Sequence, residues 1–137
     1  DQLFGIARWI KDFPSDNLAQ PIALNVSESW PKTKHDVIFS ANTAHIMQPQ
    51  EVEKMIANGA GSLPSRGLFC LYGPFIFENT ALAKSNLKFN RKLQDLDPGM
   101  GIRKFDDLNV MALAGSMKLL EINSMPANNH LLVWQKI

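Results

Sequence analysis

The chain has 137 residues, 45% of them hydrophobic, and its 14 lysines and arginines nearly balance 13 aspartates and glutamates, for a net charge of +1. This length predicts one domain or part of one, and the apolar content excludes a largely disordered chain. A nucleic-acid partner is not expected, because proteins that bind phosphate backbones usually carry a basic excess.

Cysteine usage and hydropathy bear on where the protein works. Cys70 is the single cysteine and cannot form an intramolecular disulfide, which favours a reducing compartment and therefore the cytoplasm. No apolar stretch approaches the roughly 20 residues of a membrane span, and no signal-peptide pattern opens the sequence. We therefore expect no membrane association.

In chain order, the first half predicts a helix over residues 2–13, where apolar residues recur at helical spacing. Short apolar strands are expected at 21–26 and 36–40. Pro49 then opens a helix that Asn58 and Gly59 close, because proline is favoured at a helix start and glycine at its end.

The second half predicts a strand at 68–72, helices at 81–96 and 105–117, and strands at 118–122 and 131–135 joined by a turn at 126–129. Strands that alternate with helices favour an α/β fold with a mostly parallel sheet. The short link between the last two strands makes that pair antiparallel.

Polar and aromatic residues follow two of the apolar strands. Asn42 and His45 come after the strand at 36–40, Tyr72 ends the strand at 68–72, and Phe75 follows it. Open α/β sheets bind ligands beyond the carboxyl ends of their strands, so we expect these residues, His45 and Tyr72 above all, to share a pocket. His45 could take a proton near neutral pH, and the aromatics could stack on a flat or cationic ligand. The alternatives are a turn cap for Asn42, packing at a helix start for His45, and core packing for Tyr72 and Phe75.

Other motifs favour structural roles. The three histidines are scattered and no paired cysteines exist, so no metal site is expected. Two glycine pairs, at 59 and 61 and at 99 and 101, follow helices, which is the wrong context for dinucleotide loops and predicts helix stops. Asn128 and Asn129 occupy the hairpin link, where asparagine is a common turn residue.

Five segments taken in order resemble a known family. They are Asn42-Thr-Ala-His-Ile46, Leu71-Tyr-Gly-Pro-Phe75, Ser85-Asn86 with Phe89, Asp97-Pro98 with Gly101-Ile-Arg103, and Met125-Pro-Ala-Asn-Asn129. The set resembles the methyltransferase-like protein 26 family of small class I methyltransferase-like proteins. That resemblance implies a Rossmann-like seven-stranded sheet with an antiparallel last strand, across whose strand ends S-adenosylmethionine (SAM) lies.

The resemblance also implies roles for particular residues. His45 and Tyr72 would be catalytic, and the methyl acceptor would be a small molecule or another, unidentified group. Asn25 stands where the family usually has aspartate and would contact the adenine amino group. The cofactor set would be Asn25, Val26 and Asn42, and the substrate pocket would comprise Phe75, Ser85, Asn86, Arg103, Asn128 and Asn129.

The match covers the carboxyl-terminal two-thirds of the family's domain. Residues 1–137 would thus form a single partial domain, with strands three to seven and a lid insertion at about 76–104. The first two strands and the glycine-rich SAM loop have no counterpart, so we expect this chain alone not to bind SAM tightly. Either an upstream segment completes the sheet or a homo-oligomer covers the exposed edge. The rival reading is a non-catalytic binding or dimerisation module.

Overall fold

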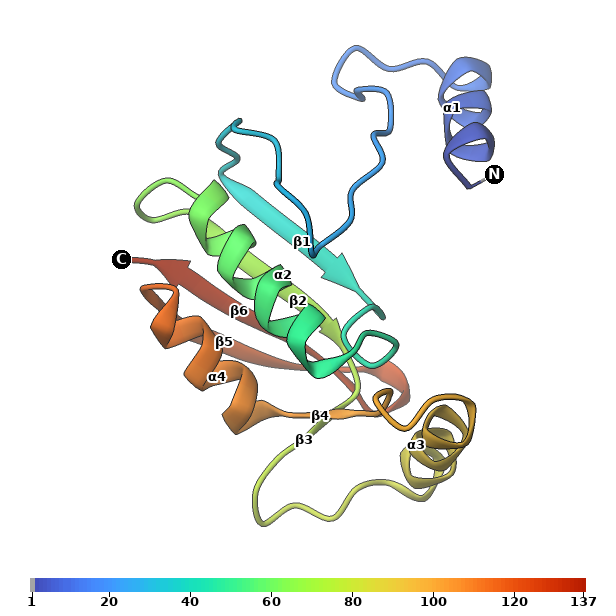
Figure 1. Cartoon of the computed structure of the whole chain (residues 1–137), viewed down its shortest axis with the longest axis vertical. Coiled ribbons are helices and arrows are strands. Elements are labelled where there is room, and N and C mark those ends of the chain that lie inside the picture. The colour runs from blue at the N-terminus through green and yellow to red at the C-terminus, as the bar shows by residue number, and fades with distance from the viewer. Residues whose placement is uncertain (1) are drawn as a thin grey trace.

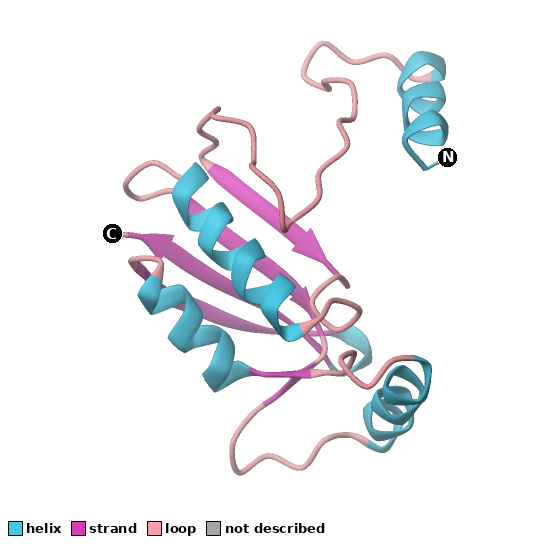
Figure 2. Cartoon of the chain, viewed as in Figure 1, coloured by secondary structure: helices cyan, strands magenta, loops and turns pink. Residues whose placement is uncertain are grey.

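A computed structural model describes residues 2–137 and arranges them as an α/β fold (Figures 1 and 2). The short 3-10 turn Pro126–Asn128 links the last two strands. In chain order the elements are α1 (Gln2–Asp12), β1 (Val37–Ala41), α2 (Pro49–Ser62), β2 (Leu68–Gly73), β3 (Phe75–Ile76), α3 (Lys84–Leu96), β4 (Arg103–Lys104), α4 (Phe105–Ala114), β5 (Met117–Met125) and β6 (Asn129–Lys136).

The main sheet, within residues 2–137, has the strand order β1-β2-β6-β5. β1 and β2 are parallel, with Ala41 opposite Tyr72, whereas β6 is antiparallel to both of its neighbours. This confirms the predicted α/β sheet with an antiparallel last strand, and the order is that of strands four to seven in the expected sheet. β3 and β4 add a second, two-residue parallel pair that the sequence did not predict.

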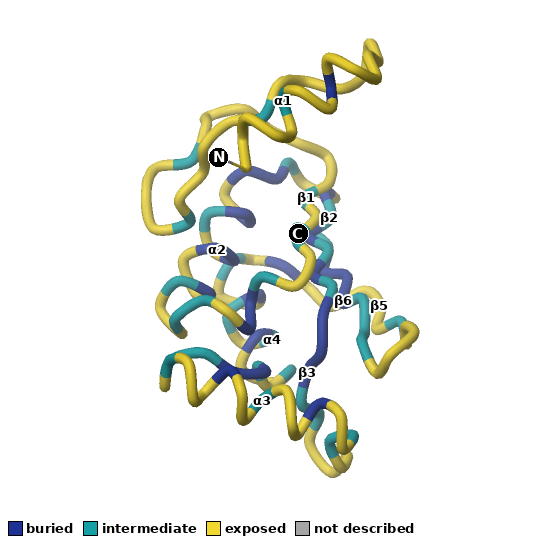
Figure 3. Tube along the Cα trace, turned by 90° about the vertical axis from the view of Figure 1, so that its right-hand side faces the viewer, coloured by how far each residue is buried: buried dark blue, intermediate teal, exposed yellow. Residues whose placement is uncertain are grey.

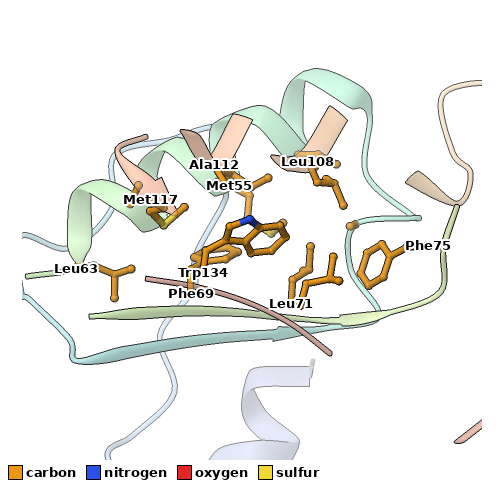
Figure 4. Packing of buried hydrophobic residues seen from close by; sticks show 14 residues of the cluster. Met55, Leu63, Phe69, Leu71, Phe75, Leu108, Ala112, Met117 and Trp134 are labelled. Atoms are coloured by element: carbon orange, nitrogen blue, oxygen red, sulfur yellow. The ribbon is translucent and has the colours of Figure 1, made fainter. Parts of the chain in front are cut away.

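The hydrophobic core lies between one face of this sheet and the helices α2 and α4 (Figure 4). β2 alternates, so that Phe69 and Leu71 are completely buried on this face while their neighbours are half-buried. β6 adds Trp134, whose Nε1 donates to Asn109 Oδ1 at 3.0 Å, so burial of the indole leaves no polar atom unpaired. The site described below is therefore attached to a rigid layer.

The opposite face of the sheet is more open. β1 pairs only with β2 among the described residues, and its Val37 and Phe39 are 53% and 63% exposed. Helix α1 lies apart from the sheet (Figure 1), and nearly all of its length is exposed (Figure 3). An unpaired strand edge and an exposed apolar face are surfaces that further protein can cover.

The strand expected at 21–26 is wrong, because the structure has no strand there. A strand needs a neighbour with which to share backbone hydrogen bonds, and this segment pairs with none of the described strands. The segment is instead held to α2, since the Asn58 side chain donates to the carbonyl of Val26 at 3.1 Å.

Helix boundaries also differ from the prediction. α2 continues through Gly59 to Ser62, because Gly59 has a packing role: a Cβ there would lie 2.4 Å from the ring of Phe69. α3 begins at Lys84, three residues later than expected, and α4 ends at Ala114. β5 and β6 are longer than predicted, and they meet at a tighter link.

Candidate functional site

The carboxyl ends of β1 and β2 lie side by side, as parallel pairing requires. Asn42, the first residue after β1, donates its backbone N–H to the carbonyl of Tyr72 at 2.9 Å. Asn42 has φ 57°, a left-handed conformation that asparagine adopts more readily than most residues. The chain therefore turns sharply at this point, and the two strand ends form one edge.

Gly73 is the meeting point at this edge. A Cβ added to it would lie 3.8 Å from Phe75 Cζ, 3.9 Å from Asn42 Oδ1 and 4.0 Å from His45 Nδ1. Three residues predicted for the site thus converge on one small residue. A methyl group would fit there in ordinary van der Waals contact, whereas a larger side chain would crowd all three.

His45 is buried at this edge beneath α3. Its side chain is 7% exposed, and its ring meets Phe89 of α3 edge to face with centroids 5.1 Å apart. Burial, and secondarily the positive charge of Arg103, lowers the pKa of His45 below its ordinary value of 6.5. The imidazole is therefore neutral at physiological pH, which is the form able to accept a proton.

Arg103, predicted to line the substrate pocket, binds the loops around His45. Its Nε donates to the carbonyl of Ala44 at 3.0 Å, and its Nη2 donates to Gly99 O at 2.8 Å and to Met47 O. These three backbone acceptors use the N–H of Nε and the two of Nη2, and they leave the two N–H groups of Nη1 without a protein partner among the described residues. Arg103 joins the loop after β1 to the segment after α3.

Tyr72 lies at the same end of the sheet as His45 but on the other face. Its hydroxyl accepts a hydrogen bond from the Asn129 side chain at 3.2 Å. Consecutive strand residues point to opposite faces, and Gly73 is the residue that faces His45. The structure therefore does not bring His45 and Tyr72 together in one pocket, although it does bring their strand ends together.

A groove of about 640 Å³ runs beside these strand ends, between the segment after β3 and the link from β5 to β6. We call it the hairpin groove. It includes four of the predicted pocket residues but neither His45 nor Tyr72. Its lining is Phe75, Phe77, Thr80, Ala81, Leu82, Ala83, Asn86, Ile122, Ser124, Met125, Ala127, Asn128, Asn129 and His130.

Hydrogen bonds between α3 and the hairpin link fix the width of this groove. Asn86, which is buried, donates from Nδ2 to the carbonyl of Asn128 at 3.1 Å. Asn128 in turn points its own Nδ2 at Ser85 Oγ, 3.4 Å away. The link itself turns through two left-handed residues, Ala127 at φ 60° and Asn128 at φ 58°. Ser85 thus supports the groove without lining it.

His130 is one of the groove residues that the sequence did not predict, and it carries an ionisable side chain. In the sequence it is one of three scattered histidines, and it directly follows the pair Asn128 and Asn129. Its ring packs edge to face against Phe77 with centroids 4.7 Å apart. Burial lowers the pKa of His130 below its ordinary value. The missed signal was its place as the first residue beyond a predicted ligand-binding turn.

Of the two residues expected to hold the cofactor, Asn25 is exposed in a turn, whereas Val26 is half-buried and packs against the core. Asn25 Oδ1 accepts from the backbone N–H of Ser27 at 2.9 Å, and its Nδ2 donates to Glu28 Oε1 at 3.1 Å. The Asn25 side chain therefore closes a local turn in this structure. A larger open hollow of about 970 Å³, lined by residues between 4 and 20, adjoins α1. Helix α1 itself lies apart from the sheet (Figure 1).

Residues 1–136 match the protein family described as "Protein of unknown function (DUF938)". The chain is a DUF938 protein. Its membership covers nearly the whole sequence printed here, so the edge at Gly73 and the hairpin groove both lie within the family's own region.

Solved structures show which fold this DUF938 protein has. The mitomycin 7-O-methyltransferase MmcR superposes with a TM-score of 0.81 at 12% identity, covering 95% of this chain and 38% of that one. An O-methyltransferase family 2 protein from Planctomyces limnophilus in complex with apigenin superposes with a TM-score of 0.72 at 16% identity, covering 84% of this chain and 33% of that one. CalO1, a methyltransferase in calicheamicin biosynthesis solved with SAH bound, superposes with a TM-score of 0.68 at 13% identity, covering 84% of this chain and 33% of that one.

The DUF938 protein therefore has the class I methyltransferase fold, as the resemblance predicted. The chain spans between a third and two-fifths of the length of these structures. Within residues 2–137 no group of three or more His, Cys, Asp or Glu side chains could hold a metal ion. In the same part of the chain, none of the helices has the length and hydropathy to cross a membrane.

Proposed function

We propose that the protein carrying this chain is a SAM-dependent methyltransferase of the methyltransferase-like protein 26 type. The supporting observation is the strand order β1-β2-β6-β5, with Asn42, His45 and Phe75 gathered at Gly73 where the parallel strands end. This is the edge at which open α/β sheets bind ligands. Neighbours of the same fold include a methyltransferase described with SAH bound, at low identity.

The residues at this edge fit part of a SAM site. The absence of a side chain at Gly73 leaves a space that a Cβ would fill, bordered by the uncharged polar group of Asn42. Asn42 would contact the cofactor from β1. We also propose that Asn25 and Val26 reach the adenine, which requires the turn at residues 25–28 to rearrange. The rest of the site would come from outside these residues.

When bound, SAM supplies a methyl group on a sulfonium, which the acceptor's lone pair attacks in line as the carbon–sulfur bond breaks. Such a transfer gains mainly from positioning and exclusion of water. His45, neutral and buried, is our first candidate to take the acceptor's proton, and Tyr72 is the second. Residues 76–104 would act as the lid, because Phe89 of α3 already covers His45.

The acceptor would lie in the hairpin groove. Phe75 connects the two parts of the site, since it contacts the space at Gly73 and also lines the groove. Asn86, Asn128 and Asn129 would position the acceptor through amides whose charge does not change with pH. We also propose that the reaction takes place in the cytoplasm, because the single cysteine, Cys70, is unpaired and a reducing compartment suits such a chain.

Isothermal titration of SAH into the full-length protein tests the proposal. We expect micromolar binding, and weaker binding in Gly73→Val, whose branched side chain would crowd Asn42, His45 and Phe75. Gly61→Ala is the matched control, because a Cβ at Gly61 would meet nothing within 4 Å. A protein that is folded by circular dichroism yet gives no heat with SAM or SAH would refute the assignment.

The exposed sheet supports a second candidate, a non-catalytic module that binds another copy of itself. β1 presents an unpaired edge in the described residues, and Val37 and Phe39 leave an apolar surface beside it. Sedimentation velocity of the full-length protein separates the two candidates. A dimer that Phe39→Lys dissociates and that ignores SAH would favour the module, and a monomer that binds SAH would exclude it.

A further inference from the structure

The hairpin groove carries no formal charge on its walls. Its described lining consists of aromatic, aliphatic, hydroxyl, amide and imidazole side chains, with no aspartate, glutamate, lysine or arginine among them. A phosphate or carboxylate buried there would lose its hydration without gaining a charged partner, which is unfavourable. The groove therefore selects against anionic ligands, and its volume of about 640 Å³ is that of a small-molecule site.

His130 supplies an unused hydrogen-bonding group at this wall. Its Nδ1 is buried and has no hydrogen-bond partner. A proton on that nitrogen would be a buried, unpaired donor, so the favoured neutral form carries its proton on Nε2. Nε2 is the nitrogen left to donate to a ligand in the groove.

Aromatic packing holds the imidazole in place. Phe77 meets His130 edge to face, and Phe77 is itself stacked on Phe105 at 5.3 Å with 26° between the rings. Phe75, which is 4% exposed, also lines the groove and lies beside Gly73. These rings and Met125 offer flat and polarisable surfaces, which favour a planar ligand.

We infer that the acceptor is an uncharged, flat small molecule that lies in the hairpin groove and accepts a hydrogen bond from His130. This inference rests on the proposed function only in that it calls the ligand a methyl acceptor. Binding to the groove can be measured without cofactor, so failure here and failure of methyl transfer are separate results.

The test uses two probes with one ring system, 2-naphthol and 2-naphthyl phosphate, titrated into full-length protein without SAM and followed by probe fluorescence. We expect 2-naphthol to bind and the phosphate to bind at least about tenfold more weakly, since a buried anion would lack a partner. Equal binding of both probes, stronger binding of the phosphate, or no saturable binding of 2-naphthol would overturn the inference.

Variants of His130 locate the probe. His130→Leu removes the donor and should weaken 2-naphthol binding about five- to tenfold, while His130→Gln keeps an N–H and should recover most of it. His35→Leu is the matched control, because His35 is exposed and lies outside the groove. If His130→Leu folds by circular dichroism and binds as wild type does, the naphthol lies elsewhere and the inference is wrong. SAH binding by the same variants reports separately on the proposed function.

Discussion

Replacing Gly59 with alanine is a direct test of how α2 packs on the sheet. The added Cβ would lie 2.4 and 2.9 Å from two ring carbons of Phe69, against 3.4–4 Å for ordinary contacts, so the overlap approaches 1 Å. Phe69 has no room to retreat, because it is completely buried and tilted against Trp134 at a centroid distance of 6.4 Å.

Two opposing effects set the size of the change. Overpacking a core costs about 1–3 kcal/mol, and the near 1 Å overlap places Gly59→Ala towards the upper value. Alanine regains about 1 kcal/mol over glycine within a helix. The free energy of unfolding should therefore fall by about 2 kcal/mol. Gly61→Ala, in the same helix with open space around its Cβ, should raise it by up to about 1 kcal/mol.

Urea denaturation of both variants, followed by far-UV circular dichroism, measures the two changes on the same protein. The free energy of unfolding is expected to fall in one variant and to rise in the other. Any general effect of alanine in α2 applies to both variants, so the difference between them reports the packing of Gly59 alone. If Gly59→Ala were as stable as Gly61→Ala, the packing of α2 on Phe69 described here would be refuted.

Three further predictions concern the site. Ala127→Gly should raise the free energy of unfolding by about 0.5 kcal/mol in urea denaturation, because glycine relieves the left-handed strain at φ 60°; a loss would contradict this. Arg103→Met should lower it by about 2–3 kcal/mol in the same assay, since three backbone carbonyls lose a charged donor. The pKa of His45, measured by NMR, should lie below 6.5. Its unfolded form binds the proton more tightly, so stability should fall as pH drops below about 6.5, and His45→Gln should flatten that slope.

The sequence predicted best those elements whose pattern is local. The apolar runs at β1 and β2 identified both strands, and the short link identified the antiparallel β6. Proline at 49 correctly marked the start of α2. Each of these patterns depends on burial or turn chemistry within a few residues, which a single sequence displays.

Features that depend on distant neighbours were not predictable. Residues 21–26 have strand composition but no partner, and Gly59 has the composition of a helix stop but packs on Phe69. The separation of His45 from Tyr72 follows from the face that each strand end presents. The hairpin groove depends on left-handed residues at Ala127 and Asn128 and on amide contacts from α3, none of which has a sequence pattern.

The position of β6 has a consequence for biosynthesis. β6 follows every other described element in the chain, yet it lies between β2 and β5 and brings Trp134 into the core. During translation β2 leaves the ribosome some sixty residues before its partner, so Phe69 and Leu71 lack the neighbouring strand until residues 129–136 emerge. Such long-range pairing slows folding, and nascent chains stalled before β6 should depend on chaperones that hold exposed apolar strands.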